Sequence, residues 1–169
     1  IIGYNTDAYG IAAALAEEGC RMHNANVVVM GAGGAARAIV TQAALDGAAQ
    51  VAIVNRTVKR AEQLVTEVLE NCRRLPAQER PHPLPRCQVL RYDEIRTALQ
   101  DAHVLINATS VGLRENDALL FDPAYIHPST FVYDTIYNPP QTRLLIEAKQ
   151  NGCQRTSNGL SMLLHQGAR

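Results

Sequence analysis

The sequence lacks the features that would bind it to a membrane or to a nucleic acid. Its formal net charge is zero and its isoelectric point is about 7.1, so neither nucleic acid nor an anionic lipid surface has an electrostatic reason to attract it. No apolar run approaches the roughly 20 residues that a helix needs to cross a bilayer. We therefore expect neither a membrane nor a nucleic acid as a partner.

The chain also lacks the cysteine patterns that mark metal sites. The cysteines at positions 20, 72, 87 and 153 are widely separated, and none has a second cysteine or a histidine at ligand spacing. A disulfide framework is not expected in an α/β domain of this size. We expect no metal site, reduced thiols and a cytoplasmic location.

An initiator methionine is missing, as is the basic start of a signal peptide. Residues 1–4 already look like the end of a strand, so we expect a fragment of a longer protein. The chain has 169 residues, of which 47% are hydrophobic and 19% charged. This composition suits one folded domain over residues 1–169, without a visible repeat or low-complexity tract.

Short apolar strands alternate with helical patterns along the chain. The strands are expected at 27–30, 51–54, 88–90, 103–106, 131–134 and 153–156, and the helices at 8–18, 34–45, 58–72, 93–99, 142–150 and 159–166. Continuous apolar strands of this kind are typical of a parallel sheet covered on both faces. The pattern predicts an α/β fold with a doubly wound parallel sheet, Rossmann-like, in three α/β/α layers. The proline-rich stretch 73–86, which contains His82, is expected to be an exposed loop.

A glycine turn follows the first apolar strand. Gly31, Gly33 and Ala36 have the spacing G-x-G-x-x-G/A, which binds dinucleotides in many α/β domains. The first glycine permits the turn, and the second lets the backbone approach a pyrophosphate at the amino end of the next helix. Glycine turns after strands are common in α/β domains, so this motif by itself is compatible with a dinucleotide site and with an ordinary turn between strand and helix.

The end of the second strand bears on the choice of cofactor. NAD sites usually carry Asp or Glu about 20 residues beyond the glycines, to bind the ribose hydroxyls. This chain has Asn55 and Arg56 there, with Arg60 one helical turn later. A guanidinium pairs with a 2′-phosphate that a carboxylate would repel, so we expect NADP. The alternative is a plain helix start with Thr57 as N-cap and solvated basic residues.

Polar clusters follow four of the expected strands, at 55–60, 107–112, 134–138 and 157–159. Ligands of doubly wound sheets bind outside the carboxyl ends of the strands. Because all four clusters fall at these ends, we expect them to form one site.

Several motifs together resemble the shikimate dehydrogenase family. They are Gly3-Tyr4-Asn5-Thr6-Asp7-Ala8-Tyr9-Gly10, the glycine turn 31–36, Asn55-Arg56-Thr57 with Arg60, the stretch 107–112, Tyr133-Asp134 with Tyr137, and Asn158-Gly159 through Met162 to Gln166. The G-x-N-T-D-x-x-G and N-G-x-x-M-L-x-x-Q motifs are much more specific than a glycine turn. The likeness spans nearly the whole chain in the right order.

The resemblance implies a function and a cofactor. Members of the family interconvert 3-dehydroshikimate and shikimate with NADP, within the pathway to chorismate and the aromatic amino acids. An N-terminal domain binds the substrate, and a C-terminal Rossmann domain, which this chain matches, binds NADP. The substrate is therefore expected to be shikimate or 3-dehydroshikimate.

The resemblance also implies a role for individual residues. Asp7 matches the catalytic aspartate, and the matches at the substrate are Asn5, Thr6, Tyr137 and Gln166. The cofactor matches fall into four groups: at the pyrophosphate Gly31, Ala32, Gly33, Gly34 and Ala35; at the 2′-phosphate Asn55, Arg56, Thr57 and Arg60; beside the nicotinamide ribose Asn107, Ala108, Thr109 and Ser110; and near the nicotinamide ring Gly159 and Met162.

Asp7 has a local interpretation as well. Together with Asn5 and Thr6 it is suited to capping the following helix. Ketone reduction, however, needs a proton for the developing alkoxide, and a hydrogen-bonded Lys–Asp pair can supply it. In the family the lysine lies in the N-terminal domain, together with a serine pair that holds the substrate carboxylate. Lys59 and Lys149, in helical patterns, match neither motif, so we expect the chain to bind cofactor, to need its missing substrate domain and to turn over little alone.

Three other functions stay open at this point. A quinate/shikimate dehydrogenase would use NAD or NADP, and its choice of substrate would depend on the missing part. The Rossmann domain of glutamyl-tRNA reductase shares the glycine turn and an N-R-T strand end but lacks the two specific motifs. A non-catalytic NADP-binding regulatory module would have no need of Asp7, Tyr137 or Gln166. The sequence makes no prediction of the oligomeric state.

Overall fold

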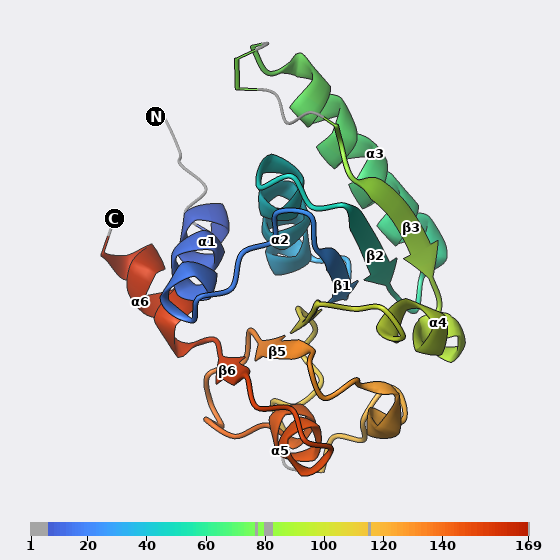
Figure 1. Ribbon diagram of the computed structural model, residues 1–169, viewed down its shortest axis with the longest axis vertical. Helices are drawn as coiled ribbons and strands as arrows, with labels where there is room; N and C mark the ends of the chain where they lie inside the picture. Colours follow the sequence, from blue (N-terminus) through green and yellow to red (C-terminus); the bar gives the residue numbers. More distant parts are fainter. Residues whose placement is uncertain (1–6, 77, 80–82, 115, 169) are drawn as a thin grey trace.

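The computed structural model describes residues 7–76, 78–79, 83–114 and 116–168 (Figure 1). One parallel sheet of six strands has the order β3-β2-β1-β4-β5-β6. Its strands are β1 (Asn26–Met30), β2 (Gln50–Val54), β3 (Arg86–Leu90), β4 (Val104–Asn107), β5 (Phe131–Asp134) and β6 (Thr156–Asn158). The helices are α1 (Asp7–Glu17), α2 (Gly34–Leu45), α3 (Val58–Arg74), α4 (Ile95–Leu99), α5 (Arg143–Gln150) and α6 (Leu160–Gly167), with short 3₁₀ turns η1 (Tyr92–Glu94) and η2 (Pro123–Tyr125).

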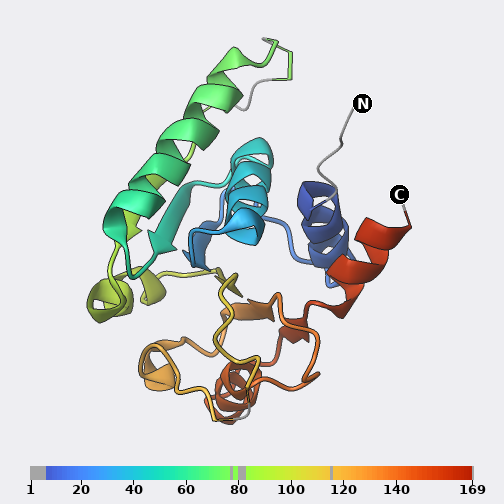
Figure 2. The same cartoon turned by 180° about the vertical axis from the view of Figure 1, so that it is seen from behind.

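Helices cover both faces of the sheet. Figures 1 and 2 show α1, α2, α3 and α6 on one side of the strands and α4 and α5 on the other. The alternation along β1 explains the two cores: Val27 and Val29 pack with the first group of helices, whereas Val28 and Met30 pack with the second. The expected doubly wound α/β/α fold is confirmed.

The helix that follows the glycine turn packs closely against its neighbours. Ala36, Ala43 and Ala44 of α2 are fully buried between the sheet and the helices α1 and α3. Small side chains let the helix approach the strands, and this fixes its amino end beside the carboxyl end of β1. The predicted bounds of this helix, 34–45, are confirmed.

The sixth strand was predicted at the wrong place. Residues 153–156 were expected to form it, but pairing with β5 runs from Thr156 to Asn158. The amide of Cys153 donates to the carbonyl of Ala148, and the Cys153 side chain is buried against α5. This apolar residue therefore ends a helix instead of starting a strand, a distinction that local hydrophobicity does not make.

Other boundaries differ by a few residues. The third strand begins at Arg86 and α3 continues to Arg74, which shortens the predicted loop 73–86; His82 lies outside the described residues. The helix expected at 93–99 is divided into η1 and α4. Thr142 is the N-cap of α5 and accepts a hydrogen bond from the amide of Leu145. None of the described helices is both long and apolar enough to cross a bilayer.

Candidate functional site

The expected polar clusters lie together along one edge of the sheet. Asn55 follows β2, Ala108 follows β4, Thr135 follows β5 and Gly159 follows β6, all at carboxyl ends. The strand order also reverses here, because β1 connects outward to β2 and β3 while its other neighbour is β4. Such a reversal opens a crevice between β1 and β4, where doubly wound sheets bind their ligands.

The first of two cavities at this edge, which we call the arginine cavity, has a volume of about 370 Å³. It is lined by Gly31, Ala32, Gly33, Asn55, Arg56, Arg60, Tyr92, Ala108, Thr109, Ser110, Val111 and Leu120. The two guanidinium groups are exposed, and none of these lining residues is acidic. The cavity is therefore suited to an anion.

The backbone around the arginine cavity strengthens this preference. Gly33 is the N-cap of α2, and no side chain among the described residues caps that end. Its first amides are thus available to a phosphate at the positive end of the helix dipole. At the other wall the Asn55 side chain donates to the carbonyl of Thr57 at 2.9 Å, which holds the turn that presents Arg56.

The second cavity, which we call the Asp7 cavity, has a volume of about 210 Å³. It is lined by Asp7, Ala35, Thr135, Tyr137, Gly159, Met162, Leu163 and Gln166. Gln166 Nε2 donates to Asp7 Oδ1 at 2.9 Å, so two residues 159 positions apart form a direct pair. Packing of α1 against α6 brings them together (Figures 1 and 2).

The two cavities flank the amino end of α2. Gly31 to Gly33 line the arginine cavity, while Ala35, less than one helical turn later, lines the Asp7 cavity. An extended dinucleotide could place its pyrophosphate at this helix end and one nucleoside on either side. The geometry is therefore suited to a dinucleotide whose reactive ring lies near Asp7.

Most of the predicted site residues line one of the two cavities. Gly34, Thr57 and Asn107 line neither; Thr57 is the N-cap of α3 without a side-chain hydrogen bond, and Asn107 is buried at 2% exposure. Asn5 and Thr6 lie outside the described residues. The roles of all these residues remain predictions.

Five lining residues were given no individual role from the sequence: Tyr92, Val111, Leu120, Thr135 and Leu163. Val111 and Thr135 do fall within two of the expected polar clusters, 107–112 and 134–138. Tyr92 lies two residues beyond the end of β3. Because ligands of doubly wound sheets bind outside the carboxyl ends of the strands, its position could have indicated a place at the site. Burial raises the pKa of the Tyr92 phenol above its usual value, and the nearby charge of Arg56 offsets part of that rise. Leu120 lies in a loop between β4 and η2, and no sequence signal marks it.

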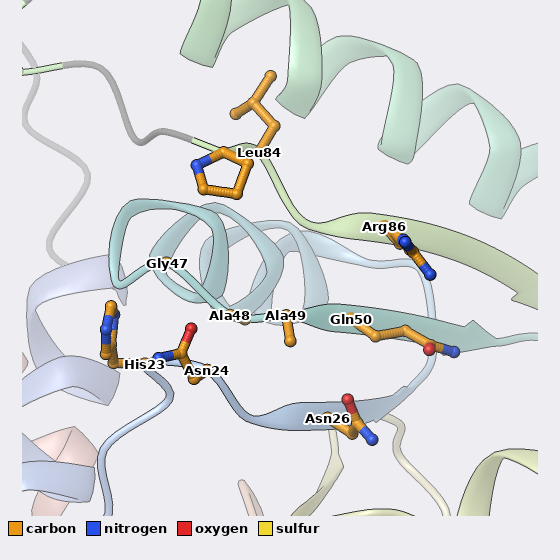
Figure 3. A pocket seen from close by; sticks show the side chains of 10 residues that line it. His23, Asn24, Asn26, Gly47, Ala48, Ala49, Gln50, Leu84 and Arg86 are labelled. Carbon is orange, nitrogen blue, oxygen red and sulfur yellow. The ribbon is translucent and has the colours of Figure 1, made fainter.

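A larger cavity, of about 450 Å³, lies at the opposite edge of the sheet (Figure 3). Asn26, Gln50 and Arg86, which line it, are the first residues of β1, β2 and β3, and Gly47 lies beyond the carboxyl end of α2. Helix carboxyl ends present carbonyl groups, which disfavour anions. We therefore place the candidate site at the smaller pair of cavities.

The sheet order, the glycine turn and the cavities around α2 define a dinucleotide-binding α/β domain of the Rossmann type. The chain belongs to the shikimate / quinate 5-dehydrogenase family, whose profile matches residues 13–114. An NADP(+)-dependent shikimate dehydrogenase of Streptococcus pyogenes serotype M49 is 37% identical over 178 residues. That alignment covers 99% of this chain and 56% of the relative.

Solved structures agree with this assignment. A shikimate 5-dehydrogenase from Listeria monocytogenes, in complex with shikimate and NAD, superposes with a TM-score of 0.84 at 34% identity over 98% of this chain and 56% of its own. A shikimate dehydrogenase in complex with NADP+ gives a TM-score of 0.83 at 37% identity over 99% of this chain and 54% of its own. The chain thus spans little more than half the length of the relatives it matches.

Proposed function

We propose that this chain is the NADP-binding domain of a shikimate dehydrogenase, which transfers hydride between NADPH and 3-dehydroshikimate to give shikimate. The observation that carries this proposal is the arginine cavity. Arg56 and Arg60 face a glycine turn and an uncapped helix end, and no carboxylate lines the cavity to repel a 2′-phosphate. The resemblance to NADP-dependent relatives supports the same choice.

Each part of the site has a proposed task. The glycine turn and the amino end of α2 would hold the pyrophosphate, and Arg56 with Arg60 the 2′-phosphate. Gly159 and Met162 would face the nicotinamide, which supplies or accepts the hydride when the cofactor is bound. Tyr137, exposed at the mouth of the Asp7 cavity, would contact the substrate.

Asp7 is proposed to act on the proton that the reaction moves. Its carboxylate accepts a hydrogen bond from Gln166, which orients the group at the wall of the cavity. Neither cavity is lined by a lysine among the described residues; Lys59 on α3 and Lys149 on α5 are exposed elsewhere. We infer that a substrate domain outside this chain, expected in the cytoplasm with it, supplies the partner lysine.

Replacement of Arg56 by alanine is expected to weaken NADP+ binding about thirtyfold, because a charge-assisted contact to the 2′-phosphate contributes about 2 kcal/mol. NAD+, which lacks this phosphate, is expected to bind wild type and variant equally. Calorimetric titration of the chain with each nucleotide measures both effects.

Arg73→Ala is the matched control for this experiment. Arg73 is an exposed arginine at the other end of α3, so its loss changes the net charge equally without touching the cavity. We expect it to leave the affinity for NADP+ within twofold of wild type. Equal affinity of the wild type for NAD+ and NADP+ would contradict the proposed clamp, as would an Arg56→Ala effect on both nucleotides.

A quinate-type dehydrogenase that uses NAD is the second candidate. It is favoured by one observation, the similarity to a quinate dehydrogenase from Corynebacterium glutamicum in complex with NAD, with a TM-score of 0.82 at 26% identity. The titration separates the two candidates, because a preference for NAD+ would support the quinate-type enzyme. Shikimate oxidation by this chain alone, at the rate of an intact enzyme, would contradict the inference that a further domain is needed.

A further inference from the structure

A buried carboxylate lies beneath the candidate site without lining either cavity. Asp134, the last residue of β5, has no solvent exposure. Only four polar or charged side chains are buried in the part of the chain that the structure describes, and three of them are bonded to one another: Asn107, Asp134 and Thr142. Burying a polar group costs free energy unless the group is hydrogen-bonded. We therefore asked what these three connected side chains hold in place.

The first branch of this network leads to the arginine cavity. Asn107 Nδ2 donates to Asp134 Oδ1 and to the carbonyl of Val111, both at 3.0 Å. Asn107 Oδ1 accepts from the Thr109 amide at 3.1 Å and from the Thr109 hydroxyl at 2.7 Å. The hydroxyl in turn accepts from the Val111 amide at 3.1 Å. Asp134 therefore holds Asn107 in the orientation that shapes the loop 108–111.

The second branch leads to the Asp7 cavity. The Ile136 amide donates to Asp134 Oδ1 at 3.1 Å, and the Ile136 carbonyl accepts from the Gly159 amide at 3.2 Å. Thr135 is held from the other side, because its amide and its hydroxyl both donate to the carbonyl of Asn107. The loop 135–137 and the start of α6 are thus tied to the same carboxylate.

The second carboxylate oxygen of Asp134, Oδ2, connects the network to the amino end of α5. Thr142, the N-cap of α5, donates its hydroxyl to Asp134 Oδ2 at 2.7 Å. The positive end of the α5 dipole faces the carboxylate there, which offsets part of the cost of burying it. Burial raises the pKa of Asp134 above its usual value, and the hydrogen bonds from Thr142, Ile136 and Asn107 offset part of that rise.

We propose that Asp134 is a positioning residue that fixes the loops of both cavities relative to each other through its buried hydrogen bonds. This rests on the proposed function, since the spacing of the two loops matters to a ligand that spans both cavities. A nucleotide confined to the arginines and the glycine turn does not need loop 135–137. The adenosine half meets only loop 108–111, whereas a whole dinucleotide meets both loops, so Asp134 should matter more for the dinucleotide than for its adenosine half.

The test compares two ligands on the 169-residue chain. For Asp134→Ala we expect NADP+ to bind at least tenfold more weakly than to wild type, while adenosine 2′,5′-bisphosphate, which meets only one of the two loops, weakens by less than threefold. Asp134→Asn keeps an oxygen toward Asn107 and Ile136 and turns its amide toward the Thr142 hydroxyl, which can accept. It should restore NADP+ binding to within threefold of wild type. Calorimetry below the unfolding temperature of each variant gives these values.

A second readout needs no nucleotide. In Asp134→Ala, amide hydrogen exchange should accelerate at Thr109, Val111 and Ile136, whose amides belong to the network, and not along β1. Should this variant fail to fold, Thr142→Val and Thr142→Ser form a near-isosteric pair. The valine variant loses the bond to Asp134 and should weaken NADP+ selectively, whereas the serine variant keeps the hydroxyl and should match wild type.

The outcomes separate the two proposals. Unchanged NADP+ affinity in Asp134→Ala overturns the positioning role, and so does an equal loss for both ligands that asparagine does not restore. A wild-type chain that binds neither nucleotide overturns the proposed function itself, and the role of Asp134 with it.

Discussion

Alanine at position 31 is expected to lower the free energy of unfolding by more than about 4 kcal/mol, or to prevent folding. Gly31 has a φ of +106°, a backbone conformation that residues with a Cβ rarely adopt. A Cβ there would also lie 2.8 Å from the carbonyl oxygen of Ala108, in the loop after β4. Strain and clash act together, and both involve backbone that cannot turn aside. Urea unfolding followed by circular dichroism measures the loss.

Gly33→Ala separates stability from binding in the same turn. Gly33 has a φ of −95°, and a Cβ there would have no neighbour within 4 Å. We expect this variant to unfold at the wild-type urea concentration but to lose NADP+ binding at least tenfold, because its methyl group would stand where the pyrophosphate approaches the backbone. A stable Gly31→Ala variant would contradict the assigned turn, and a Gly33→Ala variant with full affinity would contradict the cofactor position.

Alanine at position 159 is expected to be as damaging for a different reason. Gly159 has an ordinary φ of −75°, but an added Cβ would lie 1.9 Å from the carbonyl oxygen of Thr135 and 2.5 Å from its carbonyl carbon. Real Cβ contacts are never so short, so either α6 or the loop after β5 must move. We expect a loss of more than about 4 kcal/mol in the free energy of unfolding. Thermal unfolding by calorimetry tests this expectation.

Gly167→Ala is the control from the same helix. Gly167 ends α6, and a Cβ there would have no neighbour within 4 Å. Alanine favours helix over glycine by about 0.5–1 kcal/mol, so this variant should be at least as stable as wild type. Equal stability of the variants at 159 and 167 would mean that α6 does not approach the loop after β5 as closely as the structure has it.

Helices and strands whose ends are set by residues close to them in the sequence could be predicted from the sequence. The helix 34–45 follows a glycine turn and ends before Asp46-Gly47, and the strand 131–134 is an uninterrupted buried run. Capping groups, glycine and strand hydrophobicity act over a few residues, so the sequence alone contains them. The same is true of Arg56 and Arg60, whose spacing along one turn of helix already indicated a common direction.

The position of the sixth strand could not be predicted from the hydrophobic pattern of neighbouring residues. Cys153 is as apolar as a strand residue, yet its burial comes from packing against α5, and the strand itself, 156–158, is only half buried. Which segment pairs with β5 depends on the length of α5 and on where the chain leaves it. Both are properties of the assembled sheet, which hydrophobic pattern does not specify.

The sequence by itself determined the doubly wound fold, the glycine turn, the two arginines and the edge of the sheet where they meet, because these follow from short-range patterns and from the shared direction of parallel strands. Only the tertiary structure decided that Gln166 bonds to Asp7 and that Tyr92 faces the arginines. It also turned Asn107 inward, toward Asp134 and away from the cavity. Those contacts join residues far apart in the chain, and their geometry exists only once the helices have packed on the sheet.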